Sequence, residues 1–175
     1  MNDRGVVAVQ IDREPRSVVD VVARCTLEMP TVIKVPPHLD DGTPFPTTYW
    51  LTCPLAGRRI GRLEAAGGVK QADLRIATDA KYADAYSKAM ERYRVERDKM
   101  VGPNPPAHLP EGGVAGSRGG VKCLHAHYAD HAAGNINPVG ADVADAVEPL
   151  DCAIACVVES GEQVARNSDW VEPKR

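Results

Sequence analysis

One proline-rich segment, residues 36–47, most constrains the fold of this chain. Its sequence, PPHLDDGTPFPT, holds four of the fourteen prolines and an Asp-Gly pair. A helix does not pass through such a density of turn-forming residues, so the segment predicts an ordered loop. Short runs of strand composition flank it, namely SVVDVVARC at 17–25, TVIKV at 31–35 and TTYWLTC at 47–53. We therefore expect a small N-terminal sheet of about three strands, which sequential order favours as antiparallel.

Helical periodicity follows the strands. Helices are predicted over residues 54–67, 79–100 and 121–133, and a short one after Pro138. Residues 102–120, GPNPPAHLPEGGVAGSRGG, predict a long flexible loop between them. Because strands come first and helices second, the expected class is α+β, with the sheet packed against several C-terminal helices.

The size and charge of the chain exclude several classes of protein. Its 175 residues fit a single domain over 1–175, and 43% apolar and 26% charged residues are typical of a globular chain. The net charge of −3 lacks the basic excess of a nucleic-acid-binding surface, so we expect no nucleic-acid partner. No apolar run is long enough to span a membrane, and the N-terminus lacks the order of a secretory signal. A cytoplasmic protein is expected.

Five cysteines in a cytoplasmic chain of this size argue against a disulfide framework. Metal ligation and buried thiols are the competing interpretations, because an odd number of cysteines in a reducing compartment does not pair. The densest group of ligand-type residues is KCLHAHYADH, residues 122–131, within the predicted helix 121–133. In that helix Cys123, His127, Asp130 and His131 share one face, whereas His125 lies on the edge of the apolar face.

Axial distance limits which of these residues one ion can reach. Cys123 and His131 are about 12 Å apart along a helix axis, so zinc would take Cys123 with His127, or His127 with His131. The first pair needs further ligands, and Cys53, Cys152 and Cys156 can supply them. The predicted metal ligands are therefore Cys53, Cys123, His127, Cys152 and Cys156. Zinc is the preferred ion, and an iron–sulfur cluster is a weaker alternative. Packed thiols without any metal compete with both.

Two enzymatic interpretations use the same helix face. His127 to His131, HYADH, is similar to the inverted zincin pattern His-x-x-Glu-His, with Asp130 in place of the glutamate general base. Alternatively, Cys123 follows glycines near a helix N-terminus and would act as a nucleophile with a histidine base. Both predict a metal- or thiol-dependent hydrolase.

Two long motifs carry a resemblance to a known family. DDGTPFPTTYWLTCP, residues 40–54, and VKCLHAHYADHAAGNINPVG, residues 121–140, resemble the bacterial family called domain of unknown function 501. The resemblance covers about residues 8–150, which leaves 151–175 as a cysteine-containing C-terminal segment. It implies cytoplasmic bacterial proteins often encoded near a septum-formation protein and an exopolyphosphatase, with no established activity, substrate or cofactor. A metal-free interaction module in cell division or envelope physiology is thus a further alternative.

The same resemblance changes which histidine is the stronger candidate for a functional residue. It implies that the Lys-Cys-Leu-His core, Lys122 to His125, belongs to the family pattern more firmly than His127 and His131 do. His125 thereby gains weight that helix geometry alone does not give it. Substrate and protein partner are left open by the sequence.

Overall fold

A computed structural model describes residues 1–103, 105, 107–161 and 163–174. Its N-terminal half contains an antiparallel sheet with strand order β1-β2-β3, formed by Asp20–Arg24, Pro30–Lys34 and Tyr49–Leu51. The prolines at 36–47 form the connection between β2 and β3, as predicted. Together with the helices, this sheet confirms the α+β class and the antiparallel three-stranded arrangement.

The helices follow the sheet in the chain, with one exception at the N-terminus. Within the described residues the α-helices are α1 Asp3–Ile11, α2 Pro54–Ala65, α3 Gly68–Thr78, α4 Ala80–Asp98, α5 Leu124–Ala132 and α6 Pro138–Val147. A short 3₁₀ helix, η1, covers Val114–Gly116, and a C-terminal hairpin pairs β4, Val157–Ser160, with β5, Gln163–Arg166. No described helix is long and apolar enough to cross a membrane.

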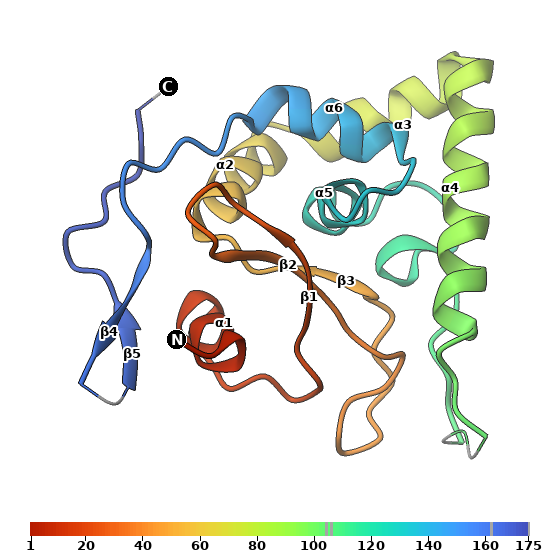
Figure 1. Cartoon of the computed structure of the whole chain (residues 1–175). Helices are drawn as coiled ribbons and strands as arrows, with labels where there is room; N and C mark the ends of the chain where they lie inside the picture. The colour runs from red at the N-terminus through yellow and green to blue at the C-terminus, as the bar shows by residue number, and fades with distance from the viewer. Residues whose placement is uncertain (104, 106, 162, 175) are drawn as a thin grey trace.

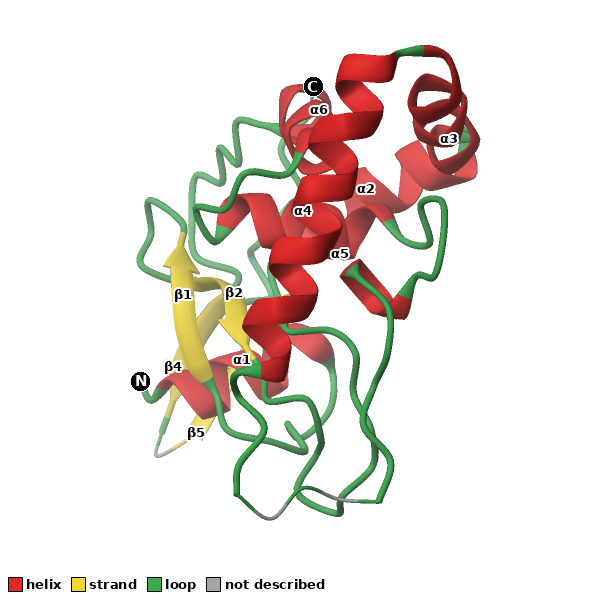
Figure 2. Ribbon diagram, turned by 90° about the vertical axis from the view of Figure 1, so that its right-hand side faces the viewer, coloured by secondary structure: helices red, strands yellow, loops and turns green. Residues whose placement is uncertain are grey.

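Helix α5 lies at the centre of the molecule. Figure 1 shows it end-on, with the sheet on one side, α2 and α4 flanking it and α6 across its other face. It packs against α6, β3, α2 and η1, while the long α4 runs along one side of the molecule (Figure 2). A central helix must bury side chains nearly all round. Accordingly α5 buries Leu124, Ala126, His127, Tyr128, Ala129 and Asp130.

Helices α1 and α3 were missing from the sequence prediction, for different reasons. The run GVVAV in α1 is β-branched and has strand composition, but Asn2 caps the segment as a helix and Val6 and Val7 pack into the core. Helix α3 begins directly after Gly67, whose φ of +92° ends α2. A single left-handed residue thus separates two helices where the Gly-Gly pair had predicted only an end.

The glycine-rich segment 102–120 contains one regular element, η1, among its described residues; residues 104 and 106 lie outside the description. Its second half is tied to α4. Arg97, only 1% exposed, donates to the carbonyl oxygens of Glu111 and Gly112, and Val114 is fully buried. Tyr86 donates to the carbonyl of Gly120. This half of the segment leads the chain into the first turn of α5.

Candidate metal centre

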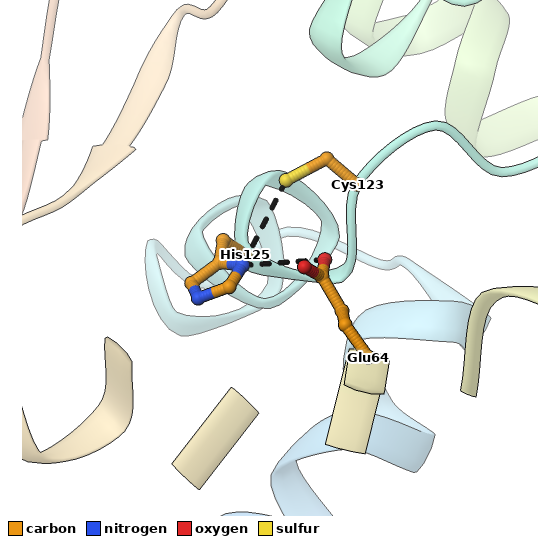
Figure 3. A group of neighbouring side chains, drawn as sticks. All are labelled: Glu64, Cys123 and His125. Carbon is orange, nitrogen blue, oxygen red and sulfur yellow. Dashed lines mark hydrogen bonds and ion pairs between the residues drawn. The ribbon is translucent and has the colours of Figure 1, made fainter. Parts of the chain in front are cut away.

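The first turn of α5 carries Cys123 and His125. Cys123 is the N-cap residue and has extended backbone angles, φ −157° and ψ 121°, so α5 begins at Leu124 and not at the predicted residue 121. Cys123 therefore does not share a helix face with His127 in the way that ideal helix angles had predicted. Its side chain lies instead beside His125 (Figure 3).

Contacts from α2 and α3 fix this starting point. The first backbone N–H groups of a helix lack partners within the helix. Glu64 of α2 supplies one, because its Oε1 accepts from the Leu124 N–H at 2.6 Å. Asp73 of α3 accepts from the Val121 N–H at 2.7 Å. Gly68 allows the close approach, since a Cβ there would lie 2.9 Å from Leu124 Cδ1.

The imidazole of His125 is held at both ring nitrogens. Nε2 lies 3.0 Å from the carbonyl oxygen of Gly57, and a carbonyl can only accept, so Nε2 carries the proton and donates. Nδ1 then faces two other groups, Glu64 Oε1 at 3.2 Å and Cys123 Sγ at 3.9 Å (Figure 3). A backbone carbonyl that holds one nitrogen and orients the other is the usual outer contact of a metal-binding histidine.

Helix α2 makes two of these three contacts. Gly57 and Glu64 are seven residues apart, about two helical turns, so they lie on the same face of α2. Helix carbonyls point toward the C-terminus, whereas side chains lean toward the N-terminus. The Gly57 carbonyl and the Glu64 carboxylate therefore approach the His125 ring from its two sides.

A carboxylate and a thiol face Nδ1. The hydrogen bond with Cys123 is the largest influence and raises the pKa of His125 to about 9, with smaller contributions from the Gly57 carbonyl and the Glu64 charge; burial acts in the opposite direction. The side chains of Glu64 and His125 are 28% and 31% exposed. The centre is thus open to solvent, and its field favours a cation at Nδ1, whether a proton or a metal ion.

The spacing of the donor atoms suits a metal ion. Zinc bonds of about 2.0–2.3 Å in a tetrahedron place donor atoms about 3.3–3.6 Å apart. The contacts at His125 Nδ1, 3.2 and 3.9 Å, differ from this by a few tenths of an ångström. Across the described part of the chain, three donors of His, Cys, Asp or Glu lie within 4.8 Å of one another only at Glu64, Cys123 and His125.

Comparison with protein families places the chain. Residues 21–145 match the sequence profile of a family described as a protein of unknown function, DUF501. The chain belongs to the DUF501 family. Comparisons with curated proteins and with solved structures found no match. The matched residues include Glu64, Cys123 and His125, so the cluster lies inside the part of the DUF501 chain that defines the family, whereas Cys152 and Cys156 lie beyond it.

His127, a predicted ligand, lies inside the core of the DUF501 fold. It is 0% exposed, stacks on Tyr86 with ring centroids 5.8 Å apart, and uses Nδ1 toward Asn137 Oδ1 at 3.1 Å. Burial lowers the pKa of His127 to about 4, although Asn137 and the charge of Asp73 oppose this. A neutral buried ring with an acceptor on Nδ1 is a packing element of the core.

Asp130 belongs to the same buried network. Its carboxylate accepts from Arg92 and from Asn137 Nδ2, the latter at 2.8 Å, and is 0% exposed. The carboxylate is thus held by Arg92 and Asn137, and within the described residues His127, Asp130 and His131 form no group with three close donor atoms. The inverted zincin pattern therefore brings together no metal centre of the expected kind.

The predicted cysteine ligands separate into two places. Cys53, Cys152 and Cys156 line one small cavity, which Cys25 also lines, whereas Cys123 lies with His125 and Glu64. All five thiols are free. Sequence reasoning did not name Glu64, and it counted Cys25 among the five cysteines without including it in the predicted ligands. Glu64 carries no motif, and only its position two turns after Gly57 in α2 distinguishes it from other surface glutamates.

Proposed function

We propose that this DUF501 protein binds one zinc ion through Glu64, Cys123 and His125. The observation that supports the proposal is the convergence of a carboxylate oxygen, a thiol sulfur and Nδ1 within 4.8 Å of one another on a half-exposed surface. Three protein ligands and an accessible fourth position are typical of catalytic zinc sites, in which the fourth ligand is water or substrate. Such a site lowers the pKa of bound water and polarises carbonyl or phosphoryl groups. Hydrolysis is accordingly the reaction class that we propose.

The location proposed for this chemistry is the bacterial cytoplasm. Free thiols persist where the compartment is reducing, and Cys123 must be reduced to bind an ion. A net charge of −3 gives no reason to propose a nucleic-acid substrate.

Zinc titration of the reduced, chelator-stripped protein tests the proposal. In a chain that also carries Cys152→Ser and Cys156→Ser, so that Cys123 supplies the thiolate, the variants Cys123→Ser, His125→Ala and Glu64→Gln should each weaken binding at this centre by about 10-fold or more. Co²⁺ in place of zinc should give a tetrahedral spectrum with a thiolate charge-transfer band that Cys123→Ser removes. His108→Ala is the matched control, because His108 is exposed and does not belong to the cluster. Unchanged zinc affinity in both Cys123→Ser and His125→Ala would contradict the proposal.

A second candidate is a thiol nucleophile at Cys123. Its specific support is that Cys123 caps a helix N-terminus and faces His125 Nδ1, while Nε2 is held by Gly57. Glu64 Oε1 is nearer to Nδ1 than the sulfur is, which favours the three-donor metal centre over a cysteine–histidine pair. The two differ in Glu64→Gln: metal binding should fall, whereas rapid alkylation of Cys123 in metal-free protein should persist if the thiol is the nucleophile.

A further inference from the structure

Four of the five cysteines line a single cavity away from Cys123. They come from separate parts of the chain: Cys25 follows β1, Cys53 caps the N-terminus of α2, and Cys152 and Cys156 precede β4. The cavity has a volume of about 20 Å³, room for about one water-sized sphere. Its other lining residues are mostly apolar, including Leu55, Leu150 and Trp170.

N–H groups point at two of these four sulfurs. Gln10 Nε2 lies 3.7 Å from Cys156 Sγ, and Trp170 Nε1 lies 3.4 Å from Cys152 Sγ. N–H donors stabilise a sulfur that carries negative charge, so this outer shell suits thiolates bound to a cation.

Burial disfavours the charged form of two of these thiols. It is the largest influence on Cys53 and raises its pKa to about 11, with smaller contributions from Cys156 and Cys152 and an opposing one from the backbone N–H groups of Leu55 and Ala56. Burial also raises the pKa of Cys156, with contributions from Cys152 and Cys25. A metal ion would reverse the effect, since each thiolate would then face positive charge.

We propose that Cys25, Cys53, Cys152 and Cys156 bind a single zinc ion as a tetrathiolate, independently of the Glu64 centre. Four S–H bonds break, four Zn–S bonds form, and four protons pass to solvent without transfer of electrons. A void of this size favours one ion over an iron–sulfur cluster. The role is structural, because four protein ligands leave no position for substrate. The ion fastens the C-terminal segment to β1 and α2.

Binding requires the sulfurs to move closer. A tetrathiolate has sulfurs about 3.8 Å apart, and in the described residues no three of these sulfurs lie within 4.8 Å of one another. Residues 148–156 contain no helix or strand, so Cys152 and Cys156 can move inward without breaking a regular element. The sheet fixes the position of Cys25, and α2 fixes the position of Cys53. Residues 148–156 would therefore move toward these two cysteines when zinc binds.

The test uses the full chain carrying Cys123→Ser and His125→Ala, which removes the other centre. Under reducing, anaerobic conditions we expect one equivalent of zinc to bind and to protect all four cysteines from alkylation, counted by mass spectrometry. Added Cys152→Ser or Cys156→Ser should weaken zinc binding at least 100-fold. Ala155→Ser, between the two cysteines, is the matched control and should bind like its parent.

Two results would overturn the proposal. One is absence of zinc binding by this background protein while a folded circular dichroism spectrum is retained. The other is zinc binding that leaves Cys152 and Cys156 as reactive as in the metal-free chain. Cys152 and Cys156 lie in a segment without regular structure, so their variants are expected to fold, and failure of Cys53→Ser to fold would not affect the outcome. If a chain with Cys152→Ser and Cys156→Ser and an unchanged Cys123 binds no zinc, that result would contradict the first proposal and not this one.

Discussion

Two histidines in α5, two residues apart, have opposite environments. His125 is partly exposed and faces a thiol and a carboxylate, which together with Gly57 raise its pKa to about 9. His127 is fully buried against Tyr86 and an asparagine, and burial lowers its pKa to about 4. The residue type and the helix are the same, but the two positions lie about 200° apart around the helix axis, so a different set of groups surrounds each ring.

The comparison divides α5 into a solvent-facing first turn and a buried middle. The first turn gathers donor atoms on a surface that an ion can reach. The middle uses polar side chains to complete a core network in which Asp130 and Asn137 satisfy each other. We therefore expect changes in the middle to affect stability and changes in the first turn to affect ligand binding.

The largest difference should follow removal of the buried carboxylate. Asp130→Ala removes the buried acceptor of the Asn135 and Asn137 amides and leaves Arg92 with Glu96 as an acceptor, and should cost about 3 kcal/mol in free energy of unfolding. The melting temperature should fall by about 6–12 °C. Glu64→Ala, which removes the α2 carboxylate beside the solvent-facing first turn of α5, should lower the free energy of unfolding by only about 1 kcal/mol. Urea denaturation followed by circular dichroism measures both, and equal losses would remove the distinction between the two halves.

Acid should destabilise the protein through His127. Its pKa is about 4 in the folded state and about 6.5 when unfolded, so the unfolded chain gains a proton first as the pH falls. Stability present above pH 6.5 is lost between pH 6.5 and 4, by an amount on the order of 3 kcal/mol. The comparison of wild type with His127→Asn isolates this share from that of Asp130. Parallel pH profiles for the two proteins would be the contrary result.

Zinc should stabilise the folded protein through the residues at the first turn of α5 and not through those in its middle. In a background with Cys152→Ser and Cys156→Ser, free zinc at 100 times Kd should add about 2.7 kcal/mol to the free energy of unfolding. His125→Ala should abolish the gain, whereas His127→Asn should retain it despite a lower starting stability. Thermal denaturation with and without zinc checks this. If His127→Asn also abolished the zinc-dependent increase in stability, the first turn and the middle of α5 would have to form one site.

The smallest effect should appear in metal-free protein at alkaline pH. The folded-state pKa of His125 is raised to about 9, so its contribution is fully present below about pH 6.5 and is lost as the pH rises through 9. The loss should be below about 1 kcal/mol, because the ion pair with Glu64 is partly exposed. Glu64→Gln should reduce it, as denaturation at pH 6.5 and 9.5 in the presence of a chelator would reveal. An equal loss of stability between pH 6.5 and 9.5 in the wild type and in Glu64→Gln would argue against an ion pair between Glu64 and a protonated His125.

Local patterns predicted much of the fold. The prolines at 36–47 and the periodicity of α4 and α6 depend on neighbouring residues, and the structure places these elements close to the expected boundaries. Helix α1 was missed because tertiary packing outweighs its β-branched composition. The C-terminal hairpin, β4 and β5, depends on long-range contact with α1 and left no clear periodicity.

The candidate centre was only partly accessible from sequence. Cys123 stood out as a ligand type within a dense motif, and the family resemblance directed attention to His125. Glu64 is some sixty residues away, and its role depends on how α2 packs on α5. The angular argument was wrong for Cys123 because it assumed a helix already formed at that residue, whereas the Glu64 carboxylate caps the helix one residue later.

The seven-residue interval between Gly57 and Glu64 makes the length of α2 a determinant of ring orientation. Insertion of a single residue between them would rotate the carboxylate by about 100° around the helix axis while Gly57 kept its place. His125 would lose the Glu64 carboxylate at Nδ1 and keep Cys123 at that nitrogen and the Gly57 carbonyl at Nε2. Length changes that are harmless in a surface loop would thus be costly here, and a tolerated insertion would have to restore a whole number of turns.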